Sequence, residues 1–259
     1  MPSSSSDNGL MRVESARYAL LRRLAPALRH ELVKHLQPIG MVNEVMERRL
    51  RAPSPDVVQV GDVARKITAL SRTAMTASLD MTTWLAPDPS ATVAADAAVA
   101  EVMELLRSNL GFRGFELASE VGALPQQIGK ASVRMLLPGC LLALSDSTRA
   151  PADFTISGIA DGEFLRLQVA VRMTDGSQQD PVDNSYRRFE WAEVEALAGA
   201  EDVTLTRTDS LVSLEFIILD EELESRKRLG PGLAMPIRGR LVLTRGDAPR
   251  GASSTHYLL

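Results

Sequence analysis

The feature that most constrains the fold of this chain is one stripe of apolar side chains within residues 14–51. At about 100° per residue, the stripe lies within about 40° of Leu28 on a helical wheel. Its other members are Leu21, Leu24, Leu32, His35, Ile39, Val42, Met46 and Leu50. Pro26 and Pro38 lie inside this helix and should each remove one hydrogen bond and bend it. A helix this long and this one-sided must pack against other helices.

A second helix is predicted from Val57 to Leu85, after a turn at residues 52–56 in which Asp56 is the expected N-cap. Its apolar residues alternate spacings of three and four, the pattern of a heptad seam. They are Val60, Val63, Ile67, Leu70, Ala74, Ala77, Met81 and Leu85 or Trp84. Two long helices joined by a short turn form an antiparallel hairpin. Because one hairpin cannot cover both stripes, we expect a homodimer in which two chains build a four-helix bundle.

The pattern changes after a Pro-rich linker at residues 86–90. Helices are predicted over residues 93–110, 132–144 and 191–200, and strands over residues 115–118, 154–157, 164–171, 203–206 and 211–218. This mixture indicates a two-layer α/β sandwich, so the expected fold class is α+β. The expected layout is a disordered lead (1–11), a helical hairpin domain (12–86), an α/β domain (92–220) and a tail (221–259) with one possible strand at 240–243.

Composition and charge exclude several classes of protein. The net charge is −4 and the basic residues are scattered, so no nucleic-acid partner is expected. The apolar runs are too short for a membrane span, and the first residues lack the apolar core of a signal peptide. Three histidines and one cysteine form no metal-ligand cluster. The single Cys140 lies in an apolar run, which predicts core packing and fits a reducing, cytoplasmic location.

Two histidines of the first helix have opposite expected environments. His35 falls within the apolar stripe, which predicts a packed side chain with one hydrogen-bonded nitrogen. His30 falls about 200° from Leu28 and should face solvent. From the wheel alone, His30 is either an ordinary surface histidine or a reactive imidazole.

The solvent side of this helix carries a set of residues within about 40° of His30. They are Lys34, Gln37, Met41, Glu44 and Arg48. The charged members fit an ordinary solvated face. Met41 is an apolar side chain among them, which favours contact with a partner.

Six residues around His30 resemble the phosphoacceptor motif of sensor histidine kinases: a histidine, an acid and an aliphatic residue, then Leu, Pro and Ile. They are His30, Glu31, Leu32, Leu36, Pro38 and Ile39. The resemblance covers residues 14–220 and implies a dimerisation and histidine-phosphotransfer hairpin followed by a Bergerat-type ATPase-like domain.

The resemblance implies that His30 carries a phosphoryl group and that Glu31 orients or deprotonates it. The chain departs from the family at His35, where many members have proline. It also departs at Lys34, where Thr or Asn often supports phosphatase activity.

The ATPase-like half departs further. Gly139 and Ala143 occupy the positions where the family has an Asn for magnesium and the triphosphate, and neither offers the oxygen that Mg2+ needs. The adenine-reading Asp-x-Gly-x-Gly box is reduced to Asp175-Gly176, which an ordinary turn explains. No Gly-rich lid is expected between Ser177 and Ala192. These departures predict a degenerate nucleotide site.

An acceptor histidine beside a degenerate nucleotide site is similar to the histidine phosphotransferases built on a kinase scaffold. The similarity implies a multistep phosphorelay in which His30 shuttles a phosphoryl group between aspartates of response-regulator receiver domains. It implies no cofactor of the chain's own, with Mg2+ supplied by the receiver. Three alternatives stay open: a catalytically inactive scaffold or regulator, an active kinase with an unusual nucleotide site, and an unrelated protein that dimerises through its hairpin.

Overall fold

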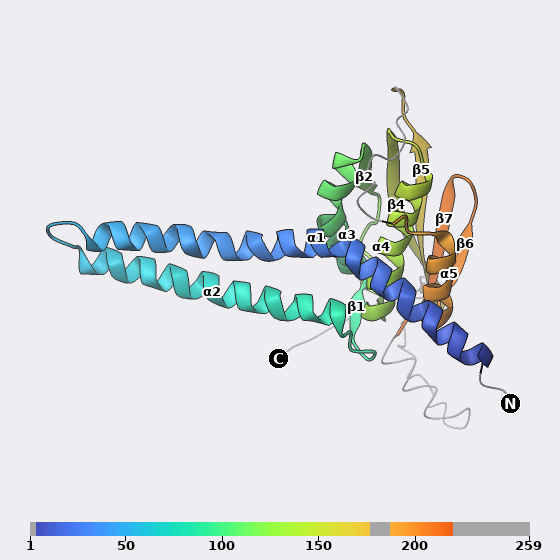
Figure 1. Cartoon of the computed structure of the whole chain (residues 1–259), viewed down its shortest axis with the longest axis horizontal. Helices are drawn as coiled ribbons and strands as arrows, with labels where there is room; N and C mark the ends of the chain where they lie inside the picture. Colours follow the sequence, from blue (N-terminus) through green and yellow to red (C-terminus); the bar gives the residue numbers. More distant parts are fainter. Residues whose placement is uncertain (1–3, 177–186, 220–259) are drawn as a thin grey trace, which may run out of the picture. The chain divides into compact units, whose positions relative to one another are not determined.

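The computed structural model describes residues 4–176 and 187–219. Helices α1 (Ser4–Leu50) and α2 (Val57–Leu85) form an antiparallel hairpin (Figure 1). Asp56 caps α2 as predicted, because its side chain accepts hydrogen bonds from the backbone N–H groups of Val58 (2.9 Å) and Gln59 (3.2 Å). In the described residues, no helix is long and apolar enough to cross a bilayer.

Helix α1 begins ten positions before the predicted Glu14, so the expected disordered lead is wrong for residues 4–11. The Ser-rich start is a weak helix former, but extending an existing helix costs far less than nucleating one. The adjoining segment is anchored by Ala16, Leu20 and Leu24, all fully buried. The helix also continues through both prolines, as predicted.

The remaining elements form an α+β fold, which confirms the expected class. The helices are α3 (Ala95–Phe112), α4 (Lys130–Ser147) and α5 (Trp191–Ala200). The strands are β1 (Thr92–Ala94), β2 (Phe115–Ser119), β3 (Gln127–Gly129), β4 (Ala152–Asp161), β5 (Phe164–Met173), β6 (Thr204–Arg207) and β7 (Leu211–Ile217).

The main sheet has the order β2-β4-β5-β7-β6, with β2 parallel to β4 and all other neighbours antiparallel. The short strands β1 and β3 form a separate antiparallel pair. The helices α3, α4 and α5 form a layer beside this sheet (Figure 1). The possible strand at 240–243 and the tail lie outside the described residues.

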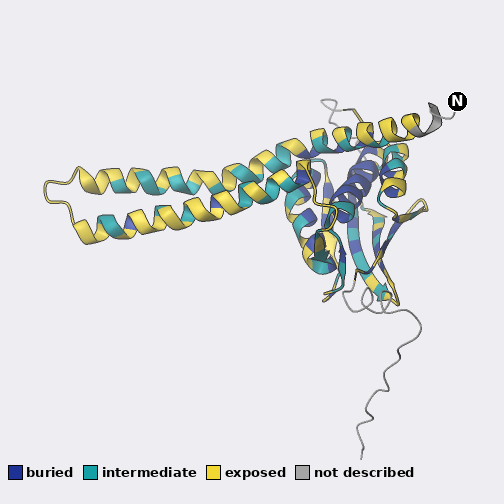
Figure 2. Ribbon diagram, turned by 90° about the horizontal axis from the view of Figure 1, so that it is seen from below, coloured by how far each residue is buried: buried dark blue, intermediate teal, exposed yellow. Residues whose placement is uncertain are grey.

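Helix α4 is the centre of the core. Every residue from Val133 to Asp146 is buried, which confirms the prediction of a buried helix (Figure 2). A helix buried all round must be covered on the side away from the sheet, and here α1, α3 and α5 pack against it. Cys140 is fully buried within it, as predicted, and burial raises the pKa of its thiol, which therefore stays protonated and unreactive.

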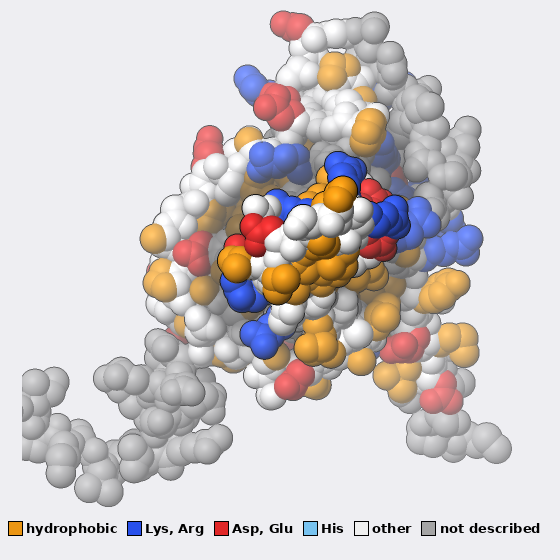
Figure 3. Space-filling model, turned by 90° about the vertical axis from the view of Figure 1, so that its left-hand side faces the viewer, with side chains coloured by type: hydrophobic (Ala, Val, Ile, Leu, Met, Phe, Trp, Pro, Cys, Tyr) orange, Lys and Arg blue, Asp and Glu red, His pale blue; other side chains and the backbone are white. Residues whose placement is uncertain are grey.

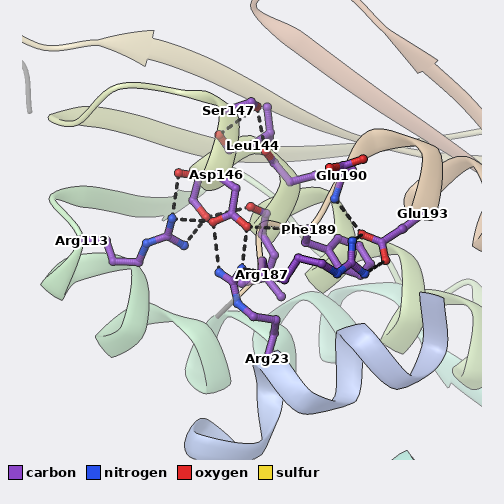
Figure 4. Close-up of polar contacts among 12 residues, drawn as sticks. Arg23, Arg113, Leu144, Asp146, Ser147, Arg187, Phe189, Glu190 and Glu193 are labelled. Atoms are coloured by element: carbon purple, nitrogen blue, oxygen red, sulfur yellow. Dashed lines mark hydrogen bonds and ion pairs between the residues drawn. The ribbon is translucent and has the colours of Figure 1, made fainter. Parts of the chain in front are cut away.

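One buried carboxylate joins four parts of the chain (Figure 4). The Asp146 Oδ2 accepts hydrogen bonds from Arg23 Nη1 of α1 (2.6 Å) and from the backbone N–H of Phe189 (2.7 Å). The Asp146 Oδ1 accepts from Arg23 Nη2 (3.1 Å) and from Arg113 Nη2, just after α3 (2.6 Å). We call this set the Asp146 clamp. Burial alone would raise the pKa of Asp146, but these hydrogen bonds and charges outweigh it, and the pKa is lowered.

A second buried charge joins α2 to the α/β layers. Arg134 of α4 is only 2% exposed and binds Asp80 of α2 (2.8 Å) and Glu101 of α3. Its guanidinium also lies 4.8 Å from the ring centroid of Trp84. The hairpin is therefore tied to the α/β layers through both of its helices.

Replacing Asp146 with Asn should leave two buried guanidinium groups without a counter-charge. We expect the free energy of unfolding to fall by about 3–5 kcal/mol at pH 7, measured by urea denaturation. Because folding lowers the pKa of Asp146, its contribution is present above the unfolded pKa of about 3.9. That contribution is lost as the pH falls through the lower folded value, so the difference between the two proteins should shrink below about pH 4.

Asp153→Asn is the matched control, because Asp153 pairs with Arg172, whose side chain is 80% exposed. An exposed pair of this kind contributes less than about 1 kcal/mol. Equal losses in the two variants would contradict the clamp.

Candidate functional site

His30 lies on the solvent side of α1, as predicted. Its side chain is exposed, and no contact described for the residues of this structure joins it to another side chain. His35 lies on the packed side and is 28% exposed, with Nε2 3.2 Å from Glu31 Oε1. The predicted opposite environments of the two histidines are confirmed. A neutral, accessible imidazole nitrogen on a rigid helix can act as a nucleophile.

Glu31 takes part in a small ionic network next to His30. Its Oε1 accepts a hydrogen bond from Lys34 Nζ at 3.1 Å. The same ammonium donates to Glu104 Oε1 of α3 at 2.5 Å. The hydrogen bonds that Lys34 donates to Glu104 and Glu31 raise the pKa of Lys34, and the bond from Lys34 lowers the pKa of Glu104. Because the described contacts of Glu31 lead to Lys34 and His35, the role predicted for Glu31 toward His30 stays a prediction.

The predicted partner face is exposed throughout. Its members are Lys34, Gln37, Met41, Glu44 and Arg48. Met41 is 61% exposed, and Val33 of the same helix is 47% exposed. Figure 3 looks along the hairpin from its tip and shows hydrophobic side chains gathered between charged ones. Contact of this face with a partner stays a prediction.

The side of α4 that carries Gly139 is occupied by the protein itself. A Cβ atom at Gly139 would lie 3.4 Å from Phe189 Cε1 and 4.0 Å from Val194 Cγ2. Phe189 is 2% exposed and is held by its N–H bond to Asp146. Arg23 Nη1 also donates to the Arg187 carbonyl oxygen at 3.1 Å, which fixes the same segment from α1 (Figure 4). The Phe189 ring therefore lies against the side of α4 where the resemblance places an Asn.

The other positions predicted to belong to a degenerate nucleotide site lie in different environments. Ala143 is 1% exposed and offers no polar group. Asp175 and Gly176 are both exposed and lie in a bend of the backbone. Residues 177–186 lie outside the described residues, so the expected absence of a Gly-rich lid between Ser177 and Ala192 stays a prediction for them.

Sequence reasoning missed the residues that build these networks. Arg134 lies near the start of the helix predicted over residues 132–144, Asp146 lies two positions after its predicted end, and a buried charge requires a partner. That signal was present in the sequence. The partners Arg23 and Phe189 are 123 and 43 positions away from Asp146 and carry no local signal.

No protein-family model matches this chain, and no curated protein matches it. Solved structures of histidine kinases are similar to it at low identity. One is the histidine kinase AdeS of Acinetobacter baumannii, with 12% identity, 74% of this chain and 98% of that chain covered, and a TM-score of 0.40. Another is a histidine kinase from Burkholderia phymatum STM815, with 18% identity, 76% and 97% covered, and a TM-score of 0.39.

A third similar structure is the histidine kinase ThkA in complex with the response regulator protein TrrA, with 10% identity, 84% of this chain and 66% of that chain covered, and a TM-score of 0.36. At these identities and TM-scores, the similarities establish neither the family of this chain nor its activity.

Gly139→Asn should destabilise the protein, because the added amide must displace the Phe189 ring or enter the core unpaired. We expect a loss of about 1–3 kcal/mol, measured by thermal unfolding. Gly199→Asn on α5 is the matched control, since a Cβ there meets nothing within 4 Å. A Gly139→Asn protein as stable as this control would show that the space beside α4 is open.

Proposed function

We propose that this chain is a histidine phosphotransferase that accepts a phosphoryl group on His30 from a receiver-domain aspartate and passes it to a second receiver. One contrast carries the proposal. The chain presents an exposed imidazole on α1, while the side of α4 that would face a nucleotide is packed against Phe189. The first feature supports phosphoryl acceptance, and the second supports acceptance from a protein donor rather than from ATP.

In the proposed reaction, the chain supplies one nucleophile, the imidazole of His30. A neutral imidazole nitrogen of His30 attacks the phosphorus atom of an aspartyl phosphate. The new P–N bond forms as the P–O bond to the aspartate breaks, and the carboxylate leaves with the electron pair. Phosphoryl transfer depends mainly on positioning and charge stabilisation. The receiver would supply Mg2+ and its acidic pocket, so the chain would need no metal or nucleotide of its own.

In this proposal, the hairpin contacts two partners, a receiver domain and a second copy of the chain. The exposed face of α1 with Met41 would contact the receiver. Leu36, Met75 and Leu79 are 46%, 62% and 63% exposed on the two hairpin helices. Apolar side chains exposed at this level suit burial against a second hairpin. A homodimer with a four-helix bundle would cover them.

The second candidate is an inactive scaffold that binds a receiver or a kinase without carrying phosphate. The described contacts of Glu31 favour it, because they lead to Lys34 and His35 and leave His30 without a neighbouring base. Loss of function in a His30 variant would separate the two candidates.

The test is phosphoryl transfer to the full chain from a panel of radiolabelled, phosphorylated receiver domains with Mg2+. Label should appear on the wild type and on His256→Gln, which replaces the third histidine of the chain. His30→Gln should take no label, and labelled ATP alone should label neither protein. The label should be stable in alkali and labile in acid, as expected for phosphohistidine.

Three results would contradict the proposal. Label from ATP alone would identify a kinase. Label on His30→Gln would identify another acceptor. No label from any receiver, with receiver binding intact, would favour the scaffold.

A further inference from the structure

The ammonium group of Lys34, one helical turn after His30, is held by two carboxylates from different helices. Lys34 follows His30 by one helical turn, which places their Cβ atoms about 5–6 Å apart on one face of α1. Its Nζ donates to Glu31 Oε1 at 3.1 Å and to Glu104 Oε1 of α3 at 2.5 Å. Residues of α1 and α3 thus hold one cation on the residue that lies one turn after His30.

These ion pairs contribute little to folding. The side chains of Lys34 and Glu104 are 49% and 65% exposed, and ion pairs this exposed are nearly neutral for stability. The acidic neighbours do have a chemical effect, because their hydrogen bonds raise the pKa of Lys34. A lysine ammonium is already charged at neutral pH, and these neighbours strengthen that preference. A charged ammonium within reach of a nucleophile can stabilise an anionic group that binds there.

Resting on the proposed function, we propose that Lys34 contacts the phosphoryl group during transfer to and from His30, and that Glu104 is the positioning residue that holds Lys34 there. The arriving phosphoryl group carries more negative charge than one carboxylate, and hydrogen bonds between charged partners are the strong ones. The ammonium would turn from Glu104 to a phosphoryl oxygen as the P–N bond forms. As the phosphoryl group leaves for the next aspartate, the ammonium would return to Glu104.

This assignment differs from a docking role for Lys34 on the partner face. A residue that only docks the receiver contributes equally before and during transfer, so its loss raises KM and leaves kcat unchanged. A residue that meets the phosphoryl group in the transition state lowers kcat when it is removed. The two roles therefore give different kinetics in the same assay.

The experiment measures kcat and KM for transfer from a phosphorylated receiver to the full chain. Lys34→Met should lower kcat by about 10- to 100-fold, the effect of losing one charge-assisted hydrogen bond. Lys34→Arg should restore part of the rate, because it keeps the charge. Lys66→Met on α2, an exposed lysine, is the matched control and should transfer at the wild-type rate.

Glu104→Gln tests the positioning role. It should lower kcat by a few-fold, about 2- to 5-fold, and should have no further effect in the Lys34→Met background, because both changes remove one function. Glu116→Gln, an exposed glutamate on β2, is its control. Additive effects of Glu104→Gln and Lys34→Met would overturn the positioning role.

Two further outcomes of the transfer assay would each lead to one conclusion. If the wild type is labelled and Lys34→Met keeps its kcat, with or without a higher KM, the phosphoryl contact is overturned and the function of His30 stands. If the wild type takes no label from any receiver, the proposed function fails and this inference fails with it.

Discussion

A single buried carboxylate organises this molecule. Asp146 is 5% exposed and satisfies hydrogen-bond donors from α1, from the end of α3 and from the backbone at Phe189. Burying an ion destabilises the fold unless charged or hydrogen-bonding partners surround it. All of these elements must therefore be in place for the fold to be stable. The same interaction does two things at once. It fixes α1, which carries His30, and it holds Phe189 against Gly139. Presentation of the histidine and closure of the space beside α4 are therefore coupled by one group.

That coupling gives the α/β layers a structural role toward the helix that carries His30. Helix α4 carries Gly139 and Ala143, which have no polar side chain, and it is buried along almost its whole length. Its buried apolar side chains belong to the same hydrophobic core as Leu20 and Leu24 of α1. In this view the α/β layers serve as a support for the helix that carries the histidine.

Local sequence patterns predicted the helices and strands well, but they did not predict contacts between residues far apart in the sequence. The N-cap at Asp56, the extent of α5 and the buried nature of Cys140 follow from neighbouring residues, and each is confirmed. The start of α1 at Ser4 was missed, because tertiary packing around Leu20 extends a helix that its own composition does not favour. The environments of His30 and His35 were predictable from helix periodicity. The partner of Lys34 on α3 was not, because a contact across 70 positions leaves no pattern in the sequence.

The continuity of α1 has one further consequence. Leu24 is locked in the core, and His30 follows six positions later in the same unbroken helix. Each residue of an α-helix advances the chain by about 1.5 Å and turns it by about 100°. The number of residues between Leu24 and His30 thus sets the direction in which the imidazole points. Inserting one residue there would rotate His30 by about 100°, from the solvent side toward the flank of the hairpin. The residues that follow His30 in the sequence would be unchanged.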